Sequence, residues 1–242
     1  MQTSFILSNE GYCVTCDSKT TFRSAYEWLR DHYVCSKCGS IPRERALMFC
    51  LEHYYPDWKN LSILELSPVS RGASVKLKKF CKHYLDSHYF PDFPFGKIHK
   101  SGFRNENIES LTFRGESFDL VITQDVLEHI FDPAKAFAEI GRVLKSGGAH
   151  IFSVPMINKE KQSEVWAKRD DKGNIICLHE PEYHGNPISK KGSLVTMHWG
   201  YDICDFIYKH SGLITIINYI DNLSLGIRAE YIEILVSKRL KD

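Results

Sequence analysis

The clearest pattern of apolar and polar positions runs from Phe118 to Pro155. Its first part, Phe118 to Thr123, is a short apolar run rich in β-branched residues, and this length and content favour a buried strand. From Pro133 onward, apolar residues recur at positions i, i+3, i+6 and i+7, which predicts a helix with one apolar face. The cation of Lys145 and the pair Gly147-Gly148 predict where that helix ends.

The run from Ala149 to Val154 predicts a second strand, which completes a strand–helix–strand unit. Such a unit makes a right-handed crossover and places its two strands parallel in one sheet. Ligands of parallel sheets bind beyond the carboxyl ends of the strands. We therefore expect Gln124, Asp125 and the pair Glu128-His129, which follow the first strand, to face a ligand.

Other apolar runs predict the rest of the sheet. Ser62 to Leu66 has the character of a strand, and the breaker cluster Ser67-Pro68 separates it from a predicted helix over Ala73 to Lys82. The remaining expected elements are strands over His83–Tyr89, Leu213–Ile220 and Tyr231–Ser237, and a helix over Tyr201–His210. Six to seven strands that alternate with helices indicate an α/β fold with a doubly wound, mostly parallel sheet.

Composition narrows the classes of function. The 242 residues carry 31 basic and 30 acidic side chains, so the formal charge of +1 provides no strong field for nucleic acid or anionic lipid. The first residues lack the basic start and apolar run of a signal peptide, and no segment has the length of a membrane span. We expect a cytoplasmic protein with no membrane contact and no nucleic-acid partner.

Four cysteines near the N-terminus have the spacing of a metal site. Cys13 and Cys16 form one CxxC pair and Cys35 and Cys38 form another, which matches a structural zinc site of four thiolates. Such a closed site would hold a ribbon too small to stabilise itself, and we expect that ribbon over residues 1–45, in a scaffolding or lid role. The alternative is a set of buried or redox-active cysteines. The other four cysteines are scattered, and we interpret them as buried apolar residues.

Several motifs together resemble a known family. ILEL-SP, NIESLTF, FDLVITQDVLEHI and VLKSGGAHIFSVP resemble the class I S-adenosylmethionine-dependent methyltransferases, in particular the type 11/12 group, over Leu61 to Leu240. The ribbon that runs into IPRERAL resembles a subset of bacterial members. The resemblance implies a Rossmann-like, seven-stranded sheet with an antiparallel last strand over residues 46–242, and S-adenosylmethionine as cofactor.

The resemblance also implies roles for single residues. Glu65 would hold the methionine amine, although its loop replaces the family's DxGxGxG with ELSPVSRG. Asp86 or His88 would meet the ribose, and Asn107 would accept from the adenine amino group. The implied cofactor-binding set is Glu65, Leu66, Ser67, Gly72, Asp86, His88, Asn107, Ile108, Gln124, Asp125 and His129.

Residues 156–200 form an insertion between the strand that ends at Pro155 and the next helix, and a long loop beside a ligand cleft commonly forms a lid. Methyl transfer to a hydroxyl needs an aligned nucleophile and a group that takes its proton. We expect His184 to be that general base, with His179 and Glu182 as orienting or alternative groups. The alternatives are that these side chains form a purely structural hydrogen-bond network within the loop, or that they bind a second metal.

The leading hypothesis is therefore O-methylation of a small polar acceptor: a sugar, a nucleotide-linked intermediate or a polysaccharide precursor. One alternative is an rRNA or tRNA methyltransferase that uses the ribbon for RNA, although residues 1–60 carry as many basic as acidic side chains. Another is a non-enzymatic binding module with a degenerate cofactor loop. For the oligomeric state, we expect a monomer or a homodimer.

Overall fold

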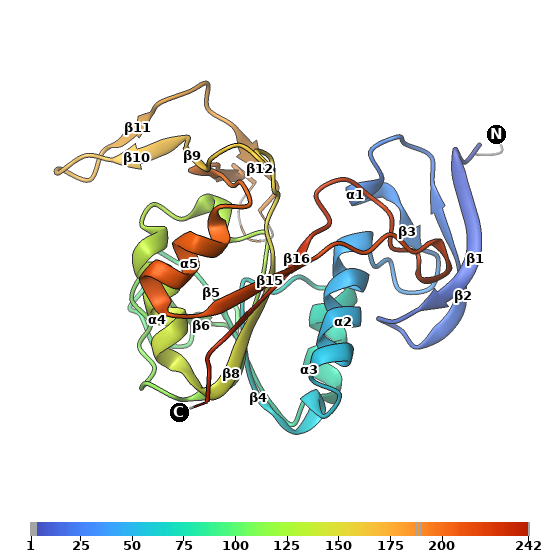
Figure 1. The fold of residues 1–242 in the computed structure, drawn as a ribbon, viewed down its shortest axis with the longest axis horizontal. Coiled ribbons are helices and arrows are strands. Elements are labelled where there is room, and N and C mark those ends of the chain that lie inside the picture. Colours follow the sequence, from blue (N-terminus) through green and yellow to red (C-terminus); the bar gives the residue numbers. More distant parts are fainter. Residues whose placement is uncertain (1–3, 187, 189, 242) are drawn as a thin grey trace.

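The computed structural model describes residues 4–186, 188 and 190–241. Its N-terminal part is a three-stranded antiparallel sheet of β1 (Leu7–Cys13), β2 (Ser18–Ser24) and β3 (Val34–Cys35), with the short helix α1 (Leu29–His32) between β2 and β3 (Figure 1). The longer helix α2 (Pro42–Tyr54) follows, with proline in its first turn. The boundary expected after residue 45 thus falls inside α2.

The main sheet has seven strands in the order β15-β16-β8-β7-β4-β5-β6. The pairs that join β6, β5, β4, β7 and β8 are parallel, whereas β16 is antiparallel to both of its neighbours. The strands are β4 (Ser62–Leu66), β5 (His83–His88), β6 (Arg104–Asn105), β7 (Phe118–Gln124), β8 (Leu144–Ser153), β15 (Ile214–Asn218) and β16 (Ile234–Lys238). The predicted α/β fold is confirmed.

Helices cover both faces of this sheet (Figure 1). The helices α2 and α3 (Gly72–Phe80) lie on one face, and α4 (Pro133–Val143) and α5 (Ile203–Ser211) lie on the other. Neighbouring residues of a strand point to opposite faces, so two separate cores form. Ile63, Leu120 and Ile151 pack toward α2 and α3, and Leu64, Val121 and Phe152 pack toward α4 and α5.

The expected lid consists of short paired strands that project beyond the sheet (Figure 1). The pairs are β10 with β11, β12 with β13, and β9 with β14. Their bounds are β9 (Glu164–Val165), β10 (Ala167–Arg169), β11 (Ile175–Cys177), β12 (Tyr183–His184), β13 (Ser193–Leu194) and β14 (Met197–His198). Three single 3-10 turns complete the chain: η1 (Trp58–Asn60), η2 (Leu127–His129) and η3 (Leu223–Leu225).

The prediction that glycines end the helix before β8 was wrong. The helix α4 ends at Val143, and the next residue already has an extended backbone as the first residue of β8. The pairing of β7 with β8 shifts in register here, because Phe118 pairs with Leu144 but Leu120 pairs with Ala149. The residues between, including Gly147 with φ +77°, form a bulge. The pair of glycines therefore belongs to the bulge in β8 and does not end the helix.

The start of the last strand was also predicted too early. Tyr231 has φ +50°, a left-handed conformation that no regular strand contains, and β16 begins only at Ile234. Within the described residues, no helix combines the length and the apolar character that crossing a bilayer requires.

Candidate functional site

Glu65 is the centre of a buried hydrogen-bond network at the carboxyl edge of the sheet. Its carboxylate accepts hydrogen bonds from the Ser74 hydroxyl at 2.6 Å, the Tyr84 hydroxyl at 2.7 Å and the Gln124 amide at 3.0 Å. The residue is 1% exposed, and this burial raises the pKa of its carboxyl group. A carboxylate has roughly four acceptor positions, so the network leaves one position for a further donor.

Asp125 directly follows β7 and connects the N-terminal part to the same edge. Its carboxylate pairs with Arg30 of α1 at 2.7 Å and with Arg43 of α2 at 2.8 Å, and accepts from the Ser153 hydroxyl at 2.8 Å. Burial opposes ionisation of Asp125, but the two guanidinium groups outweigh it and hold the pKa well below its usual range. Asp125 has φ +50°, which directs the chain away from the strand at this point.

The loop after β4 is shaped by residues of α2. Ser67 has φ +60° and Gly72 has φ +52°. A Cβ at Gly72 would lie 2.1 Å from the Glu44 carboxylate, which itself pairs with Arg71 at 2.8 Å. Glycine at position 72 thus allows the close approach of Glu44. Leu66, before this loop, packs into the core beside α4 and is 5% exposed.

The residues expected at the ribose and adenine positions have protein partners already. Asp86 pairs with Lys78 at 2.8 Å. His88 is 4% exposed, lies edge-on to the Phe103 ring with centroids 4.4 Å apart, and has a pKa that burial lowers. The Asn107 carboxamide accepts from the Glu109 backbone N–H at 3.0 Å. Ile108 is 6% exposed. Their cofactor roles stay predictions.

A second cluster of polar side chains joins the lid to η2. His184 of β12 donates from Nε2 to the Glu182 carboxylate at 3.0 Å, and the other Glu182 oxygen lies 3.0 Å from His198 Nε2. On the η2 side, Glu128 Oε1 lies 3.7 Å from both His129 Nε2 and His184 Nδ1. The Glu128 carboxylate raises the pKa of His184 to about 8 against the effect of burial, with Glu182 adding to the rise.

His179 lies in a different part of the lid. Its Nε2 is 3.0 Å from Glu164, and its ring stacks on one side of Trp166 with centroids 4.0 Å apart. His198 stacks on the same indole at 3.9 Å. The structure therefore brings His184 and Glu182 together and leaves His179 paired elsewhere.

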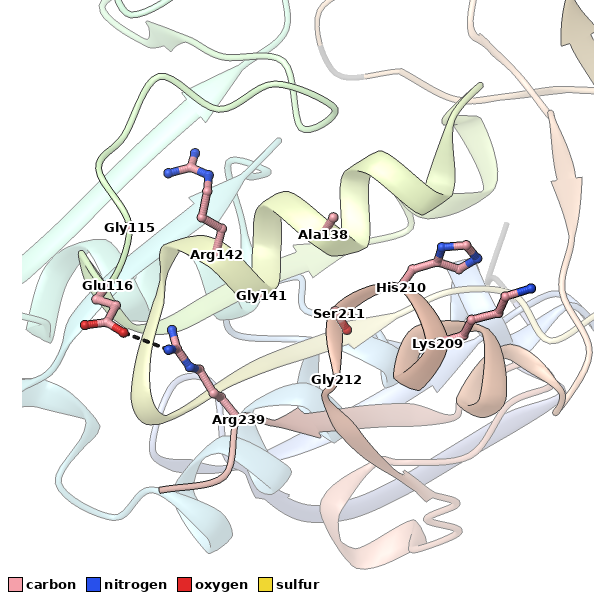
Figure 2. A pocket seen from close by; sticks show the side chains of 10 residues that line it. All are labelled: Gly115, Glu116, Ala138, Gly141, Arg142, Lys209, His210, Ser211, Gly212 and Arg239. Atoms are coloured by element: carbon pink, nitrogen blue, oxygen red, sulfur yellow. Dashed lines mark hydrogen bonds and ion pairs between the residues drawn. The ribbon is translucent and has the colours of Figure 1, made fainter. Parts of the chain in front are cut away.

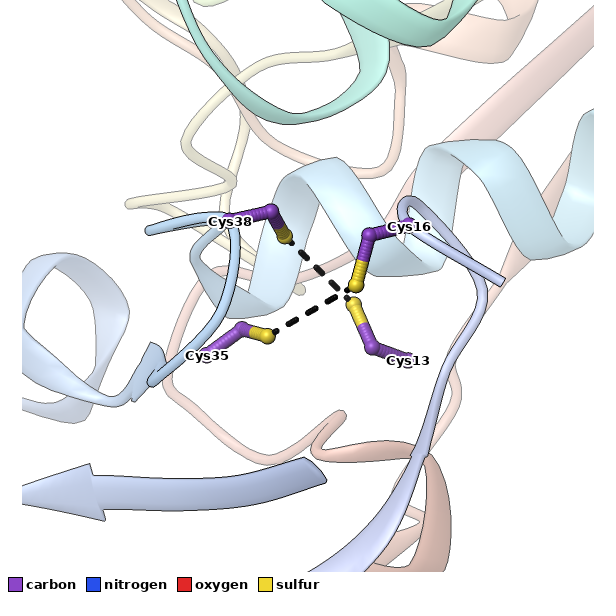
Figure 3. Close-up of side chains that lie close together, drawn as sticks. All are labelled: Cys13, Cys16, Cys35 and Cys38. Atoms are coloured by element: carbon purple, nitrogen blue, oxygen red, sulfur yellow. Dashed lines mark hydrogen bonds between the residues drawn. The ribbon is translucent and has the colours of Figure 1, made fainter. Parts of the chain in front are cut away.

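The four N-terminal cysteines converge, as their spacing predicted. Their sulfur atoms point toward one another (Figure 3), with Cys13 Sγ 3.7 Å from Cys38 Sγ and Cys16 Sγ 3.9 Å from Cys35 Sγ. All four lie within 4.8 Å of one another. Gly39, with φ +68°, forms the turn after the second pair. Four thiolates at this separation match the ligand set of a tetrahedral zinc.

Comparisons with known proteins agree with this fold. Residues 86–152 match a family model described as a methyltransferase domain. The ubiquinone biosynthesis O-methyltransferase of Ruegeria sp. is 34% identical over 138 residues, which are 46% of this chain and 55% of that protein. An uncharacterized methyltransferase of Schizosaccharomyces pombe is 44% identical over 85 residues, 33% of this chain and 31% of that protein.

A solved structure from Listeria monocytogenes, assigned to the S-adenosylmethionine-dependent methyltransferases, has the same fold. It has a TM-score of 0.50 at 14% identity and covers 83% of this chain and 99% of that chain. Residues 86–152 therefore match a methyltransferase domain family, and the chain has the fold of the class I S-adenosylmethionine-dependent methyltransferases. The family's methyl donor is S-adenosylmethionine. The chain spans about half the length of the first curated relative that it matches and about a third of the next.

Sequence analysis missed Arg30 and Arg43, which pair with Asp125 at the carboxyl edge of the sheet. Arg43 belongs to the IPRERAL motif, yet a charged run of this kind is usually solvated, and nothing local connects it with Asp125. Arg30 also donates to the Tyr231 carbonyl oxygen, so it joins the edge of the sheet to the loop before β16. The charged run RER at residues 43–45 was the one feature of the sequence that could have indicated a role for Arg43.

The described residues also line clefts outside these clusters. One of about 820 Å³ lies where α4 and α5 end, lined by Arg142, Lys209 and Arg239 among others (Figure 2). Its arginines are engaged, since Arg239 pairs with Glu116 at 2.7 Å and Arg142 with Glu139 at 2.6 Å. It lies at the opposite edge of the sheet from Glu65 and Asp125.

The second cleft, of about 460 Å³, lies at the carboxyl edge. It is lined by Lys159, Tyr201, Ile217, Tyr219 and Glu233. Glu233 is 3% exposed and has one carboxylate oxygen that no described group hydrogen-bonds. The Lys159 ammonium lies 5.6 Å from the centre of the Tyr231 ring, the residue whose carbonyl Arg30 contacts. This cleft is therefore close to the ion pair of Arg30 and Asp125.

Proposed function

We propose that this methyltransferase transfers the methyl group of S-adenosylmethionine to an oxygen of a small polar acceptor: a sugar, a nucleotide-linked intermediate or a polysaccharide precursor. The observation that carries this proposal is the cluster of Glu128, His129, Glu182 and His184, whose imidazoles and carboxylates lie at the carboxyl edge, where sheets of this kind bind ligands. Hydroxyl oxygen is a weak nucleophile until its proton leaves, so a site of this composition suits an oxygen acceptor.

The chemistry of the edge fits the amino-acid end of the donor. That end carries an ammonium and a carboxylate, and the edge offers the Glu65 and Asp125 carboxylates beside the Arg30 and Arg43 guanidinium groups. Arginine pairs well with carboxylates because its planar fork presents several donors. We assign Glu65 and Gln124 to the ammonium side and the two arginines to the carboxylate side.

When bound, S-adenosylmethionine supplies a methyl group on a positively charged sulfur. The acceptor oxygen forms a bond to the methyl carbon while the carbon–sulfur bond breaks, and its electron pair neutralises the sulfur. The hydroxyl proton passes to a base. His184 is our candidate, because its Nε2 is engaged by Glu182 and its Nδ1 has no hydrogen bond of standard length in the described structure.

Two further observations support a small polar acceptor. The cleft of about 460 Å³ is lined by an ammonium, two phenols and a carboxylate, which are groups that hydrogen-bond hydroxyls. Several curated relatives are named ubiquinone biosynthesis O-methyltransferases, and this favours oxygen as the atom methylated.

Calorimetry with S-adenosylhomocysteine and methyl transfer from tritiated S-adenosylmethionine test the proposal. We expect wild-type protein to bind the product and to label nucleotide-linked sugars, with an O-methyl group identified by NMR. His184→Ala should bind the product as wild type does but transfer methyl groups about 100-fold or more slowly, whereas His179→Ala should stay close to wild type. Labelling of ribosomal or transfer RNA in place of small acceptors, or no binding of the product, would overturn the proposal.

A further inference from the structure

Three side chains at the junction of η2 and the lid have the arrangement of metal ligands. Glu128 Oε1 lies 3.7 Å from His129 Nε2 and 3.7 Å from His184 Nδ1, and the ligand atoms of all three lie within 4.8 Å of one another. These separations exceed the range of hydrogen bonds. They are close to the roughly 3.5 Å between two ligands of one tetrahedral ion with bonds of about 2.1 Å.

Glu128 lacks the partners that a buried carboxylate requires. The residue is 2% exposed, and neither of its carboxylate oxygens accepts a hydrogen bond from any group in the described structure. A buried charge of this kind is costly unless a proton or a cation neutralises it. One of these unpartnered oxygens, Oε1, lies 3.7 Å from a nitrogen of each imidazole.

In each histidine, one ring nitrogen contacts an oxygen of the lid and the other is directed toward Glu128. His129 Nδ1 lies 2.9 Å from the Leu194 carbonyl oxygen, so Nδ1 carries the proton and Nε2 presents a lone pair toward Glu128. His184 Nε2 lies 3.0 Å from Glu182, so in the neutral ring Nδ1 presents its lone pair toward Glu128. Histidines that bind metals usually donate their other N–H to a carbonyl or a carboxylate in this way.

We propose that Glu128, His129 and His184 bind one divalent transition-metal ion. With both rings neutral, three acceptor atoms lie within 4.8 Å of one another with no donor among them, and a cation removes their repulsion. Two imidazoles and one carboxylate favour zinc, iron or cobalt over magnesium or calcium, and such a set leaves coordination positions open. This site differs from the cysteine cluster in its ligands, its openness and its place in the fold.

The consequence for catalysis rests on the proposed function. An acceptor hydroxyl at an open position of the ion would lose its proton more readily. The Nδ1 lone pair of His184 is then committed to the ion, so the proton passes to water at the open side of the lid. In this form of the enzyme His184 is a ligand, and the ion takes over its role as the group that activates the acceptor.

Cobalt titration tests the site directly. Wild-type protein whose cysteine cluster is filled with zinc should take up one further Co²⁺ per chain, followed by visible absorption and by metal content after desalting. Glu128→Gln and His184→Ala should lower the Co²⁺ affinity at least tenfold. His179→Ala removes a histidine of the same lid that pairs with Glu164, and it should bind Co²⁺ as wild type does.

NMR spectroscopy of wild-type protein with Co²⁺ tests the site even where a variant fails to fold. Bound Co²⁺ should shift the proton resonances of two imidazoles, which His129→Ala and His184→Ala assign by the loss of one resonance each. Absence of a further Co²⁺ in wild type, or equal uptake by folded Glu128→Gln, overturns the metal site. Methyl transfer by protein without this metal leaves the proposed function intact with His184 as base, whereas metal uptake without methyl transfer to any acceptor overturns the function alone.

Discussion

The ribbon and the lid are both made of short antiparallel strands, but they are attached to the sheet in different ways. Buried guanidinium groups hold the ribbon: Arg45 is fully buried and donates to the carbonyl oxygens of Tyr33 and Gly226, while Arg30 pairs with Asp125. The lid is held to η2 by hydrogen bonds of Thr196 with the backbone, and its β10–β11 tip is mostly exposed.

This difference indicates which substitutions the ribbon and the lid can each tolerate. Removing one member of a buried ion pair leaves the other charge without a partner, which is strongly destabilising. Removing a surface contact changes little. We infer that the ribbon is part of the folded unit, whereas the lid can vary its surface without cost to the fold. The two ligand clusters follow the same division, since the cysteines form a closed set and the lid cluster an open one.

The largest effect is expected from the cysteine cluster. Cys35→Ser should unfold the ribbon, because structural zinc contributes about 10–16 kcal/mol of binding free energy to small domains of this kind. Metal content and circular dichroism measure the loss. Glu128→Gln at the other cluster should leave the thermal midpoint within a few degrees. An unchanged midpoint in Cys35→Ser would show that the ribbon does not depend on metal.

The next largest effect is expected at the ion pair that docks the ribbon. Asp125→Asn leaves Arg30 without its anion and Arg43 with Asp31 alone, and it should lower the free energy of unfolding by about 3 kcal/mol. We take the lower end of the range because the Asp125 side chain is 19% exposed. Asp171→Asn, on the exposed lid, is the matched control for denaturant unfolding. Similar denaturant midpoints for the two variants would contradict the proposed difference in stability between the ribbon and the lid.

Acid should weaken the sheet before it weakens the ribbon's ion pairs. His150 is fully buried in β8, and burial lowers its pKa to about 3, whereas the unfolded chain has a histidine pKa of about 6.5. The unfolded state therefore binds the proton first, so stability is complete above pH 6.5 and falls between pH 6.5 and 3. The loss should reach about 2 kcal/mol at pH 5.

His150→Gln keeps a partner for the Thr123 hydroxyl, which lies 2.9 Å from His150 Nε2, but removes the titration. Denaturant unfolding of this variant should depend less steeply on pH between 7 and 5. The ion pair behaves differently, since the depressed pKa of Asp125 keeps its contribution until much lower pH. An equally steep fall in the variant would place the acid-sensitive group elsewhere.

The smallest effect is expected at the tip of the lid. Ile175 of β11 is 52% exposed, so Ile175→Ala should change the free energy of unfolding by no more than about 0.5 kcal/mol. Ile227 is fully buried in the loop that follows η3, and Ile227→Ala should cost about 2–5 kcal/mol. Equal costs would mean that the lid tip packs more tightly than its exposure indicates.

Local patterns predicted the framework of the fold well. The bounds of β4 agree with the sequence, Pro133 opens α4, and the cysteine spacing predicted the cluster that forms. These features depend on neighbouring residues alone. The glycine pair before β8 was misinterpreted because glycine suits both a helix end and a bulge, and only the partner strand decides between them.

The lid cluster and the ribbon's attachment could be predicted only in part. His184 and Glu182 were expected together, but the path of the lid that brings His184 to Glu128 depends on contacts with η2. Arg30 and Asp125 are 95 residues apart in the chain. No periodic pattern relates such distant residues, and side chains that meet through tertiary packing leave no mark in a single sequence.

The contact between the ribbon and the loop after η3 has a consequence for synthesis. A Cβ at Gly226 would lie 2.5 Å from the Phe22 ring, and Arg45 donates to the Gly226 carbonyl oxygen, so the ribbon's docking surface comes from the last part of the chain. Chains grow at about 5–20 residues per second. A nascent ribbon therefore waits roughly 10–40 seconds for that surface, and a metal held by the four cysteines would stabilise it during this interval.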